Sequence, residues 1–391
     1  MHKLTLKAGR EKSLLRRHPW IFSGAVQRVE GKAQPGETVA VHAGDGRFLA
    51  WAGYSPASQI VARVWSFDRT QEIDSGFFRQ GIRRAVAARE GLCDAGAGVR
   101  LVNAESDSLP GLIVDRYAGI AVLQATSAGA ARWKDAVADG LLAEASVRAV
   151  YERSDSDVME LEGLAPATGW LRGSGETRLE IVESGLRFIV DIGTGHKSGF
   201  YLDQRGNRDF VGRLAAGREV LNCFCYTGGF SVHALAHGAA SVLSIDSSAD
   251  SLTLARQNVS LNGLPEDKAQ WLEADVFKQL RTLRDQGRRF DLIVLDPPKF
   301  APTPATAERA ARGYKDINLL AFKLLRAGGL LATFSCSGGI SRELFQKIVA
   351  GAAADAAADA RILHRFEAGP DHPVSLHFPE GEYLKGLLCR V

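Results

Sequence analysis

Residues 219–246 read EVLNCFCYTGGFSVHALAHGAASVLSID and hold two apolar segments, 219–224 and 241–246, separated by a glycine-containing turn and a helical stretch. Segments of the same kind return at 270–275, 290–297 and 330–336. Strands that alternate with helices in this way predict a mostly parallel sheet with helices on both faces. The sequence therefore predicts an α/β domain from about residue 186 to residue 391.

We expect helices in this domain over Ser231–His237, Ala249–Asn262, Val276–Gln286, Ile317–Ala327 and Ser341–Ala358. The alanine-rich sequence GAAADAAADA (351–360) is interpreted as helix rather than linker. Two strands, Arg361–Glu367 and Leu384–Val391, come last with no helix between them. Their direct succession predicts an antiparallel hairpin at the edge of the sheet.

Upstream, residues 1–70 show short strands between Gly- and Pro-containing turns, at Leu4–Lys7, Thr38–Val41, Phe48–Gly53 and Gln59–Trp65. They predict a small β-barrel-like domain. Residues 71–185 mix strands at 100–103, 111–115, 120–125 and 148–153 with helices at 76–91 and 131–145, which predicts a central α+β domain. Strands at Leu179–Val182 and Leu186–Asp191 lead into the α/β domain.

The net charge of +3 is unevenly distributed. Residues 1–70 contain 11 Lys and Arg against 5 Asp and Glu, so the rest of the chain is slightly acidic. A basic amino-terminal domain indicates a polyanionic partner, although a chance surface excess explains the charge equally well. RRHPWIFSGAV (16–26) interleaves basic and aromatic residues, as nucleic-acid-binding surfaces do.

The five cysteines, Cys93, Cys223, Cys225, Cys336 and Cys389, show no CxxC spacing. They predict neither a disulfide framework nor a metal site, and suit a reducing compartment. No apolar stretch approaches the about 18 residues of a membrane helix, and the first ten residues lack a signal-peptide core. We expect a cytoplasmic protein without a membrane partner; a homodimer stays open.

The loop after the first strand of the α/β domain, Asn222–Ser231, is the predicted cofactor site, because ligands of open parallel sheets bind beyond the carboxyl ends of the strands. Gly228 and Gly229 let the backbone approach a ligand, but the spacing is not GxGxxG. Asp246 and Asp275 end the next two strands, where one could hold a ribose and the other an adenine amine. This order is typical of S-adenosylmethionine enzymes, while each aspartate alone could simply cap the helix that follows. The predicted cofactor contacts in these loops are Asn222, Phe224, Tyr226, Thr227, Gly228, Gly229, Asp246, Asp275 and Asp296.

DPPKF (296–300) follows the fourth strand and FSCSGG (334–339) ends the fifth. Two prolines stiffen the first loop, so we expect Asp296 to face the cleft and clamp the substrate base. A lone cysteine on an apolar strand is usually inert core, but Cys336 lies at a strand end beside that loop. Its thiolate could add to carbon 6 of a pyrimidine and so activate carbon 5 for methylation. The sequence does not identify the base that removes the carbon-5 proton.

With these residues in hand, the chain resembles the bacterial large-subunit (23S) ribosomal RNA cytosine-C5 methyltransferase family over essentially its full length. GREKSLLRRHPWIFSGAV (9–26) is similar to the start of that family's RNA-binding PUA domain, and TGHKSGFYLDQR (194–205) to its TGxKxGFxLDQR signature. DPPKF, SCS and the terminal FPEGEYLKGLLCRV (378–391) also match.

The resemblance implies a Rossmann-like class I methyltransferase domain with a mostly parallel seven-stranded sheet, preceded by a PUA β-barrel and a central α+β domain. It also implies a 23S rRNA target, S-adenosyl-L-methionine as cofactor and Cys336 as nucleophile. Phe200, Asp203, Gln204 and Arg205 of the signature would then wall the cofactor pocket. Other RNA cytosine-C5 enzymes carry a second cysteine after the Pro-Pro pair, where this chain has Lys299, which leaves product release unexplained.

Three other functions remain open. Uridine-C5 enzymes pair a DPP motif with Ser-Cys, but Asn-Pro usually follows it, whereas Ser337 and Gly338 follow here. A related guanine-N7 family shares the signature and the Asp-Pro-Pro loop but needs no nucleophile, so Cys336 argues against it. A non-catalytic RNA-binding assembly factor would explain neither Asp296 nor Cys336.

The predicted RNA contacts are Arg10, Lys12, Arg16, Arg17 and Lys299 on phosphates, with Trp20 as a stacking residue. Phe22 and Tyr201 are further stacking candidates, although each aromatic side chain could equally belong to a core. A solvated surface is an equally good explanation of Lys299. The target nucleotide, and whether naked RNA or an assembling subunit is the substrate, do not follow from the sequence.

Overall fold

The structure is a computed structural model that describes residues 2–92, 96–155, 158–300 and 307–391. Cys93 therefore lies outside the described residues. The chain forms two compact units. The first comprises Met1–Val182, Val190–Leu202 and Pro370–Gly381, and the second Glu183–Ile189, Asp203–Gly369 and Glu382–Val391. The three-domain division at residues 70 and 185 stays a prediction.

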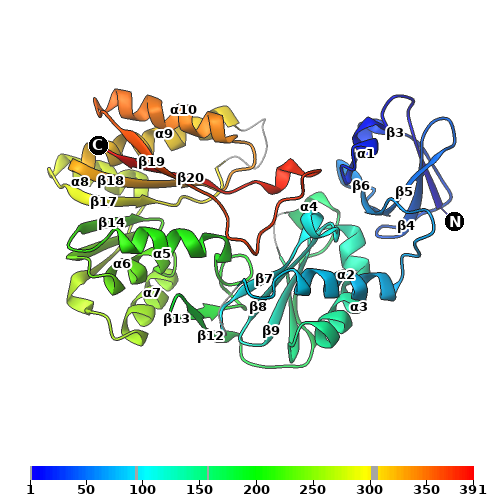
Figure 1. The fold of residues 1–391 in the computed structure, drawn as a ribbon, viewed down its shortest axis with the longest axis horizontal. Coiled ribbons are helices and arrows are strands. Elements are labelled where there is room, and N and C mark those ends of the chain that lie inside the picture. Colours follow the sequence, from blue (N-terminus) through cyan, green and yellow to red (C-terminus); the bar gives the residue numbers. More distant parts are fainter. Residues whose placement is uncertain (1, 93–95, 156–157, 301–306) are drawn as a thin grey trace. The chain divides into compact units, whose positions relative to one another are not determined.

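The first unit begins with a six-stranded sheet in the order β2-β6-β5-β4-β1-β3 (Figure 1). Its strands are β1 (His2–Leu6), β2 (Trp20–Phe22), β3 (Val26–Glu30), β4 (Thr38–His42), β5 (Phe48–Tyr54) and β6 (Ile60–Ser66). Alternate residues such as Leu4, Leu6, Val39 and Val41 fill one buried core, which confirms the expected β-barrel-like unit. The sequence pattern does not predict α1 (Lys12–Leu15), β2 or β3, because elements of three to five residues show too little periodicity.

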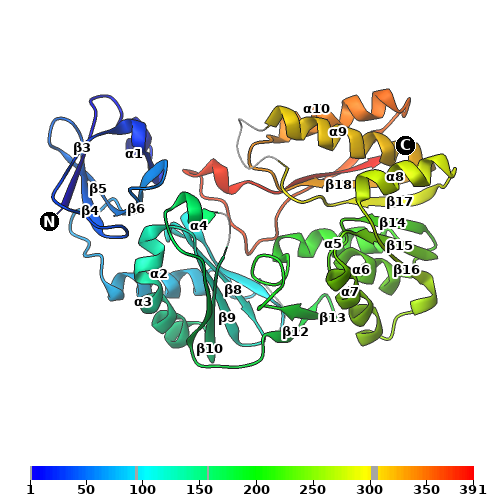
Figure 2. The same cartoon turned by 180° about the vertical axis from the view of Figure 1, so that it is seen from behind.

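The central part of the first unit is a sheet in the order β11-β10-β9-β8-β7. It consists of β7 (Val99–Asn103), β8 (Leu112–Tyr117), β9 (Ile120–Ala125), β10 (Ala149–Ser154) and β11 (Ala167–Arg172). Helices α2 (Ser75–Ala87) and α3 (Ala128–Glu144) lie side by side and share an apolar core with this sheet (Figure 2). The short helix α4 (Val158–Leu161) precedes β11, and neither is predicted from the sequence.

The second unit is built on a seven-stranded sheet in the order β16-β15-β14-β17-β18-β20-β19. Its parallel strands are β14 (Glu219–Cys223), β15 (Ser241–Asp246), β16 (Ala269–Glu273), β17 (Phe290–Leu295) and β18 (Leu325–Ser335). Strands β19 (Arg361–Phe366) and β20 (Lys385–Arg390) are antiparallel to each other, and β20 is antiparallel to β18. The mostly parallel α/β sheet and the terminal hairpin are confirmed. Of the two hairpin strands, only β19 is an edge strand, because β20 pairs with β18 on its other side.

Helices cover both faces of this sheet (Figure 1). One layer contains α5 (Arg205–Arg213), α6 (Gly229–Ala236) and α7 (Ala249–Leu261), and the other α8 (Val276–Asp285), α9 (Ala307–Leu324) and α10 (Arg342–Asp355). The second layer packs Leu280, Ile317 and Phe345 against Leu221 and Ile293 of the strands. This burial holds the carboxyl ends of the central strands in fixed positions, where the predicted site residues lie.

Two predictions about the second unit are wrong, and one helix has no counterpart in the sequence pattern. The sequence pattern does not predict helix α5. Its buried residues include Asn207 and Arg208, so the helix lacks the apolar stripe by which amphipathic helices are recognised. Helix α9 begins at Ala307 rather than residue 317. GAAADAAADA is only partly helical: α10 ends at Asp355, and Ala357 takes a left-handed conformation (φ +53°) that closes the helix. Strands β12 (Arg178–Glu183) and β13 (Leu186–Asp191) form a small two-stranded sheet.

Candidate active site

The predicted cofactor loop lies at the switch point of the seven-stranded sheet, because β14 is flanked by β15 on one side and β17 on the other. After Cys223 the backbone is left-handed at Phe224 (φ +60°), Tyr226 (φ +47°) and Gly228 (φ +77°). This conformation turns the chain sharply before α6 begins at Gly229. At Gly228 a Cβ would lie 2.9 Å from the Cβ of Ala255, so no larger residue fits there without displacement.

Two buried polar atoms of this loop lack partners within the described part of the chain: Oδ1 of Asn222 and Oγ1 of Thr227. Nδ2 of Asn222 donates to Oγ of Ser231 at 2.8 Å, and Asn258 donates to the Thr227 carbonyl at 3.0 Å. The loop is therefore held rigidly while two acceptors remain for a ligand. Buried polar atoms without protein partners fit a polar cofactor at this position.

Asp246 ends β15, as predicted, whereas β16 ends at Glu273 and Asp275 lies two residues beyond it. The Asp246 carboxylate accepts hydrogen bonds from the amides of Tyr226 (2.8 Å) and Ser248 (3.0 Å). It thereby links the β15 end to the cofactor loop. Asp275 is exposed and caps α8, accepting from the amide of Lys278 at 3.0 Å. Helix capping thus engages one carboxylate oxygen of Asp275. This is the alternative role that the sequence left open for an aspartate in front of a helix.

The carboxyl-terminal part of the signature contacts the Asp-Pro-Pro loop (296–298) in the second unit. Gln204 donates from Nε2 to Oδ1 of Asp296 at 3.0 Å and accepts from Asn207 at 2.6 Å. Asp203 accepts a hydrogen bond of 2.7 Å from the hydroxyl of Tyr383. The Arg205 Nε lies 3.9 Å from Glu183. The structure therefore brings Gln204 and Asp296 together, which supports the pairing of the two motifs.

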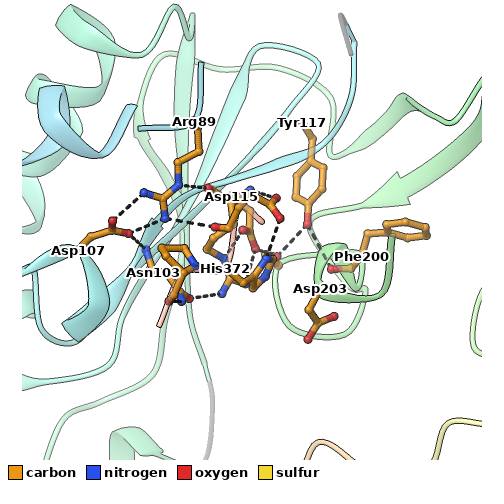
Figure 3. A network of polar contacts seen from close by, with 12 residues as sticks. Arg89, Asn103, Asp107, Asp115, Tyr117, Phe200, Asp203 and His372 are labelled. Carbon is orange, nitrogen blue, oxygen red and sulfur yellow. Dashed lines mark hydrogen bonds and ion pairs between the residues drawn. The ribbon is translucent and has the colours of Figure 1, made fainter. Parts of the chain in front are cut away.

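The amino-terminal part of the signature is anchored within the first unit (Figure 3). Ser198 donates to Asp115, which also forms an ion pair with Arg100. The Tyr117 hydroxyl contacts Ser198 at 3.0 Å and the Phe200 carbonyl at 3.4 Å. Phe200 is buried, and its carbonyl is thus fixed against β8.

The same network continues to the 370–381 segment of the first unit. Arg89 forms a bidentate pair with Asp107 at 2.7 Å and donates to the Asp371 carbonyl at 3.2 Å. The Asp371 carboxylate accepts from the Arg100 amide at 3.0 Å and contacts His372 at 3.0 Å. His372 is therefore a buried structural residue, while His196 and His377 are exposed.

The structure places Cys336 beside the Asp-Pro-Pro loop, as the sequence predicts. The Cys336 thiol lies 3.9 Å from the Pro297 carbonyl, directly after β18. The hydroxyl of Ser337 accepts from the Phe300 amide at 3.1 Å, which ties the two loops together. The buried hydroxyl of Tyr314 is hydrogen-bonded to both Ser335 and Ser337 at 2.9 Å. Burial raises the pKa of Tyr314 to about 12, so it remains a neutral phenol at physiological pH.

Cys336 differs from the other described cysteines in its exposure. Cys223, Cys225 and Cys389 are buried, whereas Cys336 is partly exposed. Burial raises the pKa of the Cys389 thiol to about 11, and it also raises the pKa values of Cys223 and Cys225 well above the ordinary range. These three thiols are therefore poor nucleophiles at neutral pH. Among the described cysteines, Cys336 is the one suited to attack a substrate.

The helix that follows the predicted cofactor loop is supported by a buried triad that the sequence pattern does not predict. Glu183 forms a bidentate ion pair with Arg208 at 2.7 Å and contacts His233 at 3.1 Å, and all three side chains are buried. The Arg208 Cδ lies only 2.7 Å from where a Cβ at Gly229 would stand. The sequence signals for this triad are weak. They are Arg208 within NRDF (207–210) and His233 within an apolar helix.

The predicted RNA contacts are exposed cations on the first unit, except for Lys299, which is exposed on the second. Arg10, Lys12, Arg16 and Arg17 lie in or next to α1, and the Arg17 guanidinium lies 4.9 Å over the Phe67 ring.

The predicted stacking residue Trp20 is half-buried. Its ring packs 4.8 Å from that of Phe378, and its Nε1 donates to Glu105 at 2.8 Å. Phe22, 50% exposed, is better placed for stacking than Trp20. Tyr201 is half-buried and carries the Lys197 ammonium 4.3 Å over its ring.

Comparison with known proteins identifies the family. S-adenosylmethionine-dependent methyltransferases match residues 162–390 and PUA-like domains match residues 4–67. The chain is 52% identical to ribosomal RNA large subunit methyltransferase I of Shewanella amazonensis, covering 100% of this chain and 99% of that protein. The chain belongs to this methyltransferase family. The enzyme of that name from Aeromonas hydrophila is 50% identical over 98% of both chains.

Solved structures agree with this methyltransferase fold. The methyltransferase SMU.776 complexed with SAH superposes with a TM-score of 0.87, covering both chains fully at 22% identity. A SAM-dependent methyltransferase from Streptococcus mutans gives a TM-score of 0.86 at 21% identity, again over both whole chains. The predicted fold class and the cofactor S-adenosylmethionine are thereby confirmed.

Two further features bear on partners. In the described ranges, no helix of this methyltransferase combines the length and apolar character that a membrane span requires. Groups of three or more His, Cys, Asp or Glu side chains suited to a metal ion are also absent from the residues that the structure describes.

Proposed function

We propose that this methyltransferase modifies carbon 5 of a specific cytosine in 23S rRNA through a covalent adduct with Cys336. The observation that carries the proposal is the partly exposed Cys336 thiol, 3.9 Å from the Pro297 carbonyl of the Asp-Pro-Pro loop. Curated relatives of this family are named for methylation of the large-subunit ribosomal RNA, which supports the choice of substrate.

The cofactor would be held by the loop after β14. Asn222 and Thr227 offer buried acceptors, Gly228 and Gly229 the close backbone approach, and Asp246 an acid at the next strand end. Bound there, S-adenosylmethionine supplies the electrophilic methyl group that the pyrimidine accepts. Asp275 could contribute through the carboxylate oxygen that does not cap α8.

Cys336 supplies what carbon 5 of cytosine lacks, which is nucleophilic reactivity. Its thiolate forms a bond to carbon 6, and the electrons of the 5,6 double bond make carbon 5 the attacking centre. After carbon 5 has gained its methyl group, a base removes the carbon-5 proton. The sulfur–carbon-6 bond then breaks, which restores the double bond and releases Cys336 as thiolate.

Asp296 is oriented for the pyrimidine edge. The side chain of Gln204 holds one carboxylate oxygen at 3.0 Å, and the following prolines restrict the backbone. One oxygen of its carboxyl group would accept from the exocyclic amine of cytosine. In the protonated state the other would donate to N3, where negative charge develops as the thiolate adds. Exposed cations around α1 would bind the RNA phosphates.

A trapping assay tests the proposal. Enzyme and cofactor are incubated with RNA that contains 5-fluorocytidine, whose fluorine cannot leave as a proton. We expect a covalent adduct with the wild type and with Cys389→Ala, a matched change of a buried cysteine in the same sheet, but none with Cys336→Ala. An adduct with 5-fluorouridine RNA alone would assign the uridine reaction instead. Methyl transfer that persists in Cys336→Ala would rule out covalent catalysis.

A further inference from the structure

A buried lysine lies next to the Cys336 loop. Lys385 opens β20, where its backbone is opposite Ser335 in the antiparallel pairing with β18. Its side chain is only 3% exposed, and Nζ donates to the carbonyls of Ser337 (2.8 Å) and Ile340 (2.6 Å). Cys336 stands between the residue that pairs with Lys385 and the residue that accepts its hydrogen bond.

Lys385 differs from the buried arginines of the chain in its lack of a carboxylate partner. Arg63, Arg100 and Arg208 each form an ion pair with a buried Asp or Glu. Over the described ranges Lys385 forms no such pair, and two backbone carbonyls satisfy only two of its three donors. A buried ammonium without a counter-ion is unfavourable unless a negative charge compensates it. A thiolate at Cys336 would be that charge.

We infer that Lys385 is a positioning residue that holds the loop after Cys336 and stabilises the Cys336 thiolate through its ammonium charge. This inference rests on the proposed function, in which Cys336 is the nucleophile. It assigns to the terminal strand a role in activating the thiol.

Electrostatics support this role. Burial lowers the pKa of Lys385 to about 8, while the charge of Cys336 acts in the opposite direction. Since the interaction between two charges is mutual, the ammonium also favours the thiolate form of Cys336 over the thiol. Glu382 also favours the ammonium, whereas Arg342 and Lys299 oppose it. Tyr314 and Asp296 are further ionisable groups around this loop, and Tyr314 is neutral.

The pKa of the Cys336 thiol tests the inference without any methyl transfer. We would measure its alkylation by iodoacetamide from pH 6 to pH 10 in the full chain, reading the Cys336 peptide by mass spectrometry. The wild-type pKa should lie below the ordinary value of about 8.5. Lys385→Met should raise it by about one pH unit or more, with alkylation about tenfold slower at pH 7. Lys385→Arg should keep the low value, and so should Lys347→Met, an exposed lysine of α10.

Each result either supports or overturns the role of Lys385. An ordinary pKa in the wild type, or an unchanged pKa in Lys385→Met, would overturn the inference. If Lys385→Met fails to fold, as shown by loss of cofactor binding in calorimetry, the wild type and Lys385→Arg still decide it. The 5-fluorocytidine assay on the same samples separates the two proposals. A low thiol pKa without an adduct contradicts only the cytosine reaction, and an adduct without a Lys385 effect contradicts only the role of Lys385.

Discussion

The side-chain amide of Gln204 donates a hydrogen bond of 3.0 Å to the carboxylate of Asp296, 92 residues further along the chain. Gln204 is itself fixed, because its carbonyl accepts from Asn207 at 2.6 Å. The last part of the family signature thus orients Asp296 of the Asp-Pro-Pro loop. A carboxylate held in one rotamer loses less entropy when it binds a base, which explains why the two motifs are paired.

Gln204→Leu should slow methyl transfer, because it removes one hydrogen bond to Asp296 while preserving side-chain volume. A hydrogen bond to a charged group contributes about 1.5–3 kcal/mol, which corresponds to roughly a tenfold to hundredfold lower rate. Single-turnover methylation of the target RNA measures it. Asn207→Leu is the matched control, because Asn207 contacts Gln204 but donates no hydrogen bond to Asp296. It should lower the methylation rate less than Gln204→Leu does. A rate within twofold of the wild type would show that Gln204 does not orient Asp296.

Asp275→Asn separates cofactor binding from helix capping. Asparagine caps a helix as well as aspartate does, so thermal stability should stay unchanged. If the carboxylate binds the adenine amine, the Kd for S-adenosylmethionine should rise about tenfold, as expected for about 1.4 kcal/mol. Isothermal titration calorimetry gives the Kd. Equal affinity in both proteins would leave Asp275 with its capping role alone.

Gly228→Ala should weaken cofactor binding and lower Tm. The new Cβ would meet Ala255 at 2.9 Å and Trp271 at 3.1 Å, in addition to the cost of the left-handed backbone. Gly217→Ala is a matched control, since Gly217 is also left-handed (φ +69°) but has open space around it. Left-handed alanine costs about 1–2 kcal/mol in either position. Equal losses of Tm in the two variants would contradict the close contact at Gly228.

Glu183→Gln should destabilise the second unit by about 3–5 kcal/mol at pH 7, because it leaves Arg208 as a buried charge without its partner. Burial alone would raise the pKa of Glu183, but the charge and hydrogen bonds of Arg208, with that of His233, lower it to about 2. A lowered pKa in the folded state means that the carboxylate stabilises the fold above its ordinary pKa of 4.5 and loses that effect as pH falls toward 2. Urea unfolding at several pH values should therefore show the two proteins converging below about pH 4.5. A constant difference would contradict the ion pair.

Replacing Arg10, Lys12, Arg16 and Arg17 by alanine should flatten the salt dependence of RNA binding. Each lost phosphate contact reduces the slope of log Kd against log salt by about 0.7 on single strands, so four contacts account for about 3. Filter binding over a range of KCl concentrations measures it. The control is the double variant Lys32→Ala and Arg47→Ala, which removes two exposed cations elsewhere in residues 1–70. It should leave the slope unchanged. An unaltered slope in the fourfold variant would place the RNA path elsewhere.

The sequence by itself determined the repeating strands and helices of residues 219–295, because apolar periodicity records which face of each element is buried. It also determined that the Asp-Pro-Pro loop and Cys336 lie side by side, since neighbouring parallel strands end at the same edge of a sheet. Helix α5 and the three-residue strand β2 escaped it, because a helix that buries Asn207 and Arg208 and a strand of three residues lack that periodicity.

Only the tertiary structure decided which side chains meet. Glu183 pairs with Arg208 and His233, Gln204 with Asp296, and Lys385 with the carbonyls after Cys336. These partners are 25 to 92 residues apart in the chain. Local pattern says that a segment is helical or extended, but a charged or polar side chain finds its partner only when distant segments pack. For that reason the proposed reacting groups of this methyltransferase are visible in its motifs, whereas the contacts that hold them appear only in its fold.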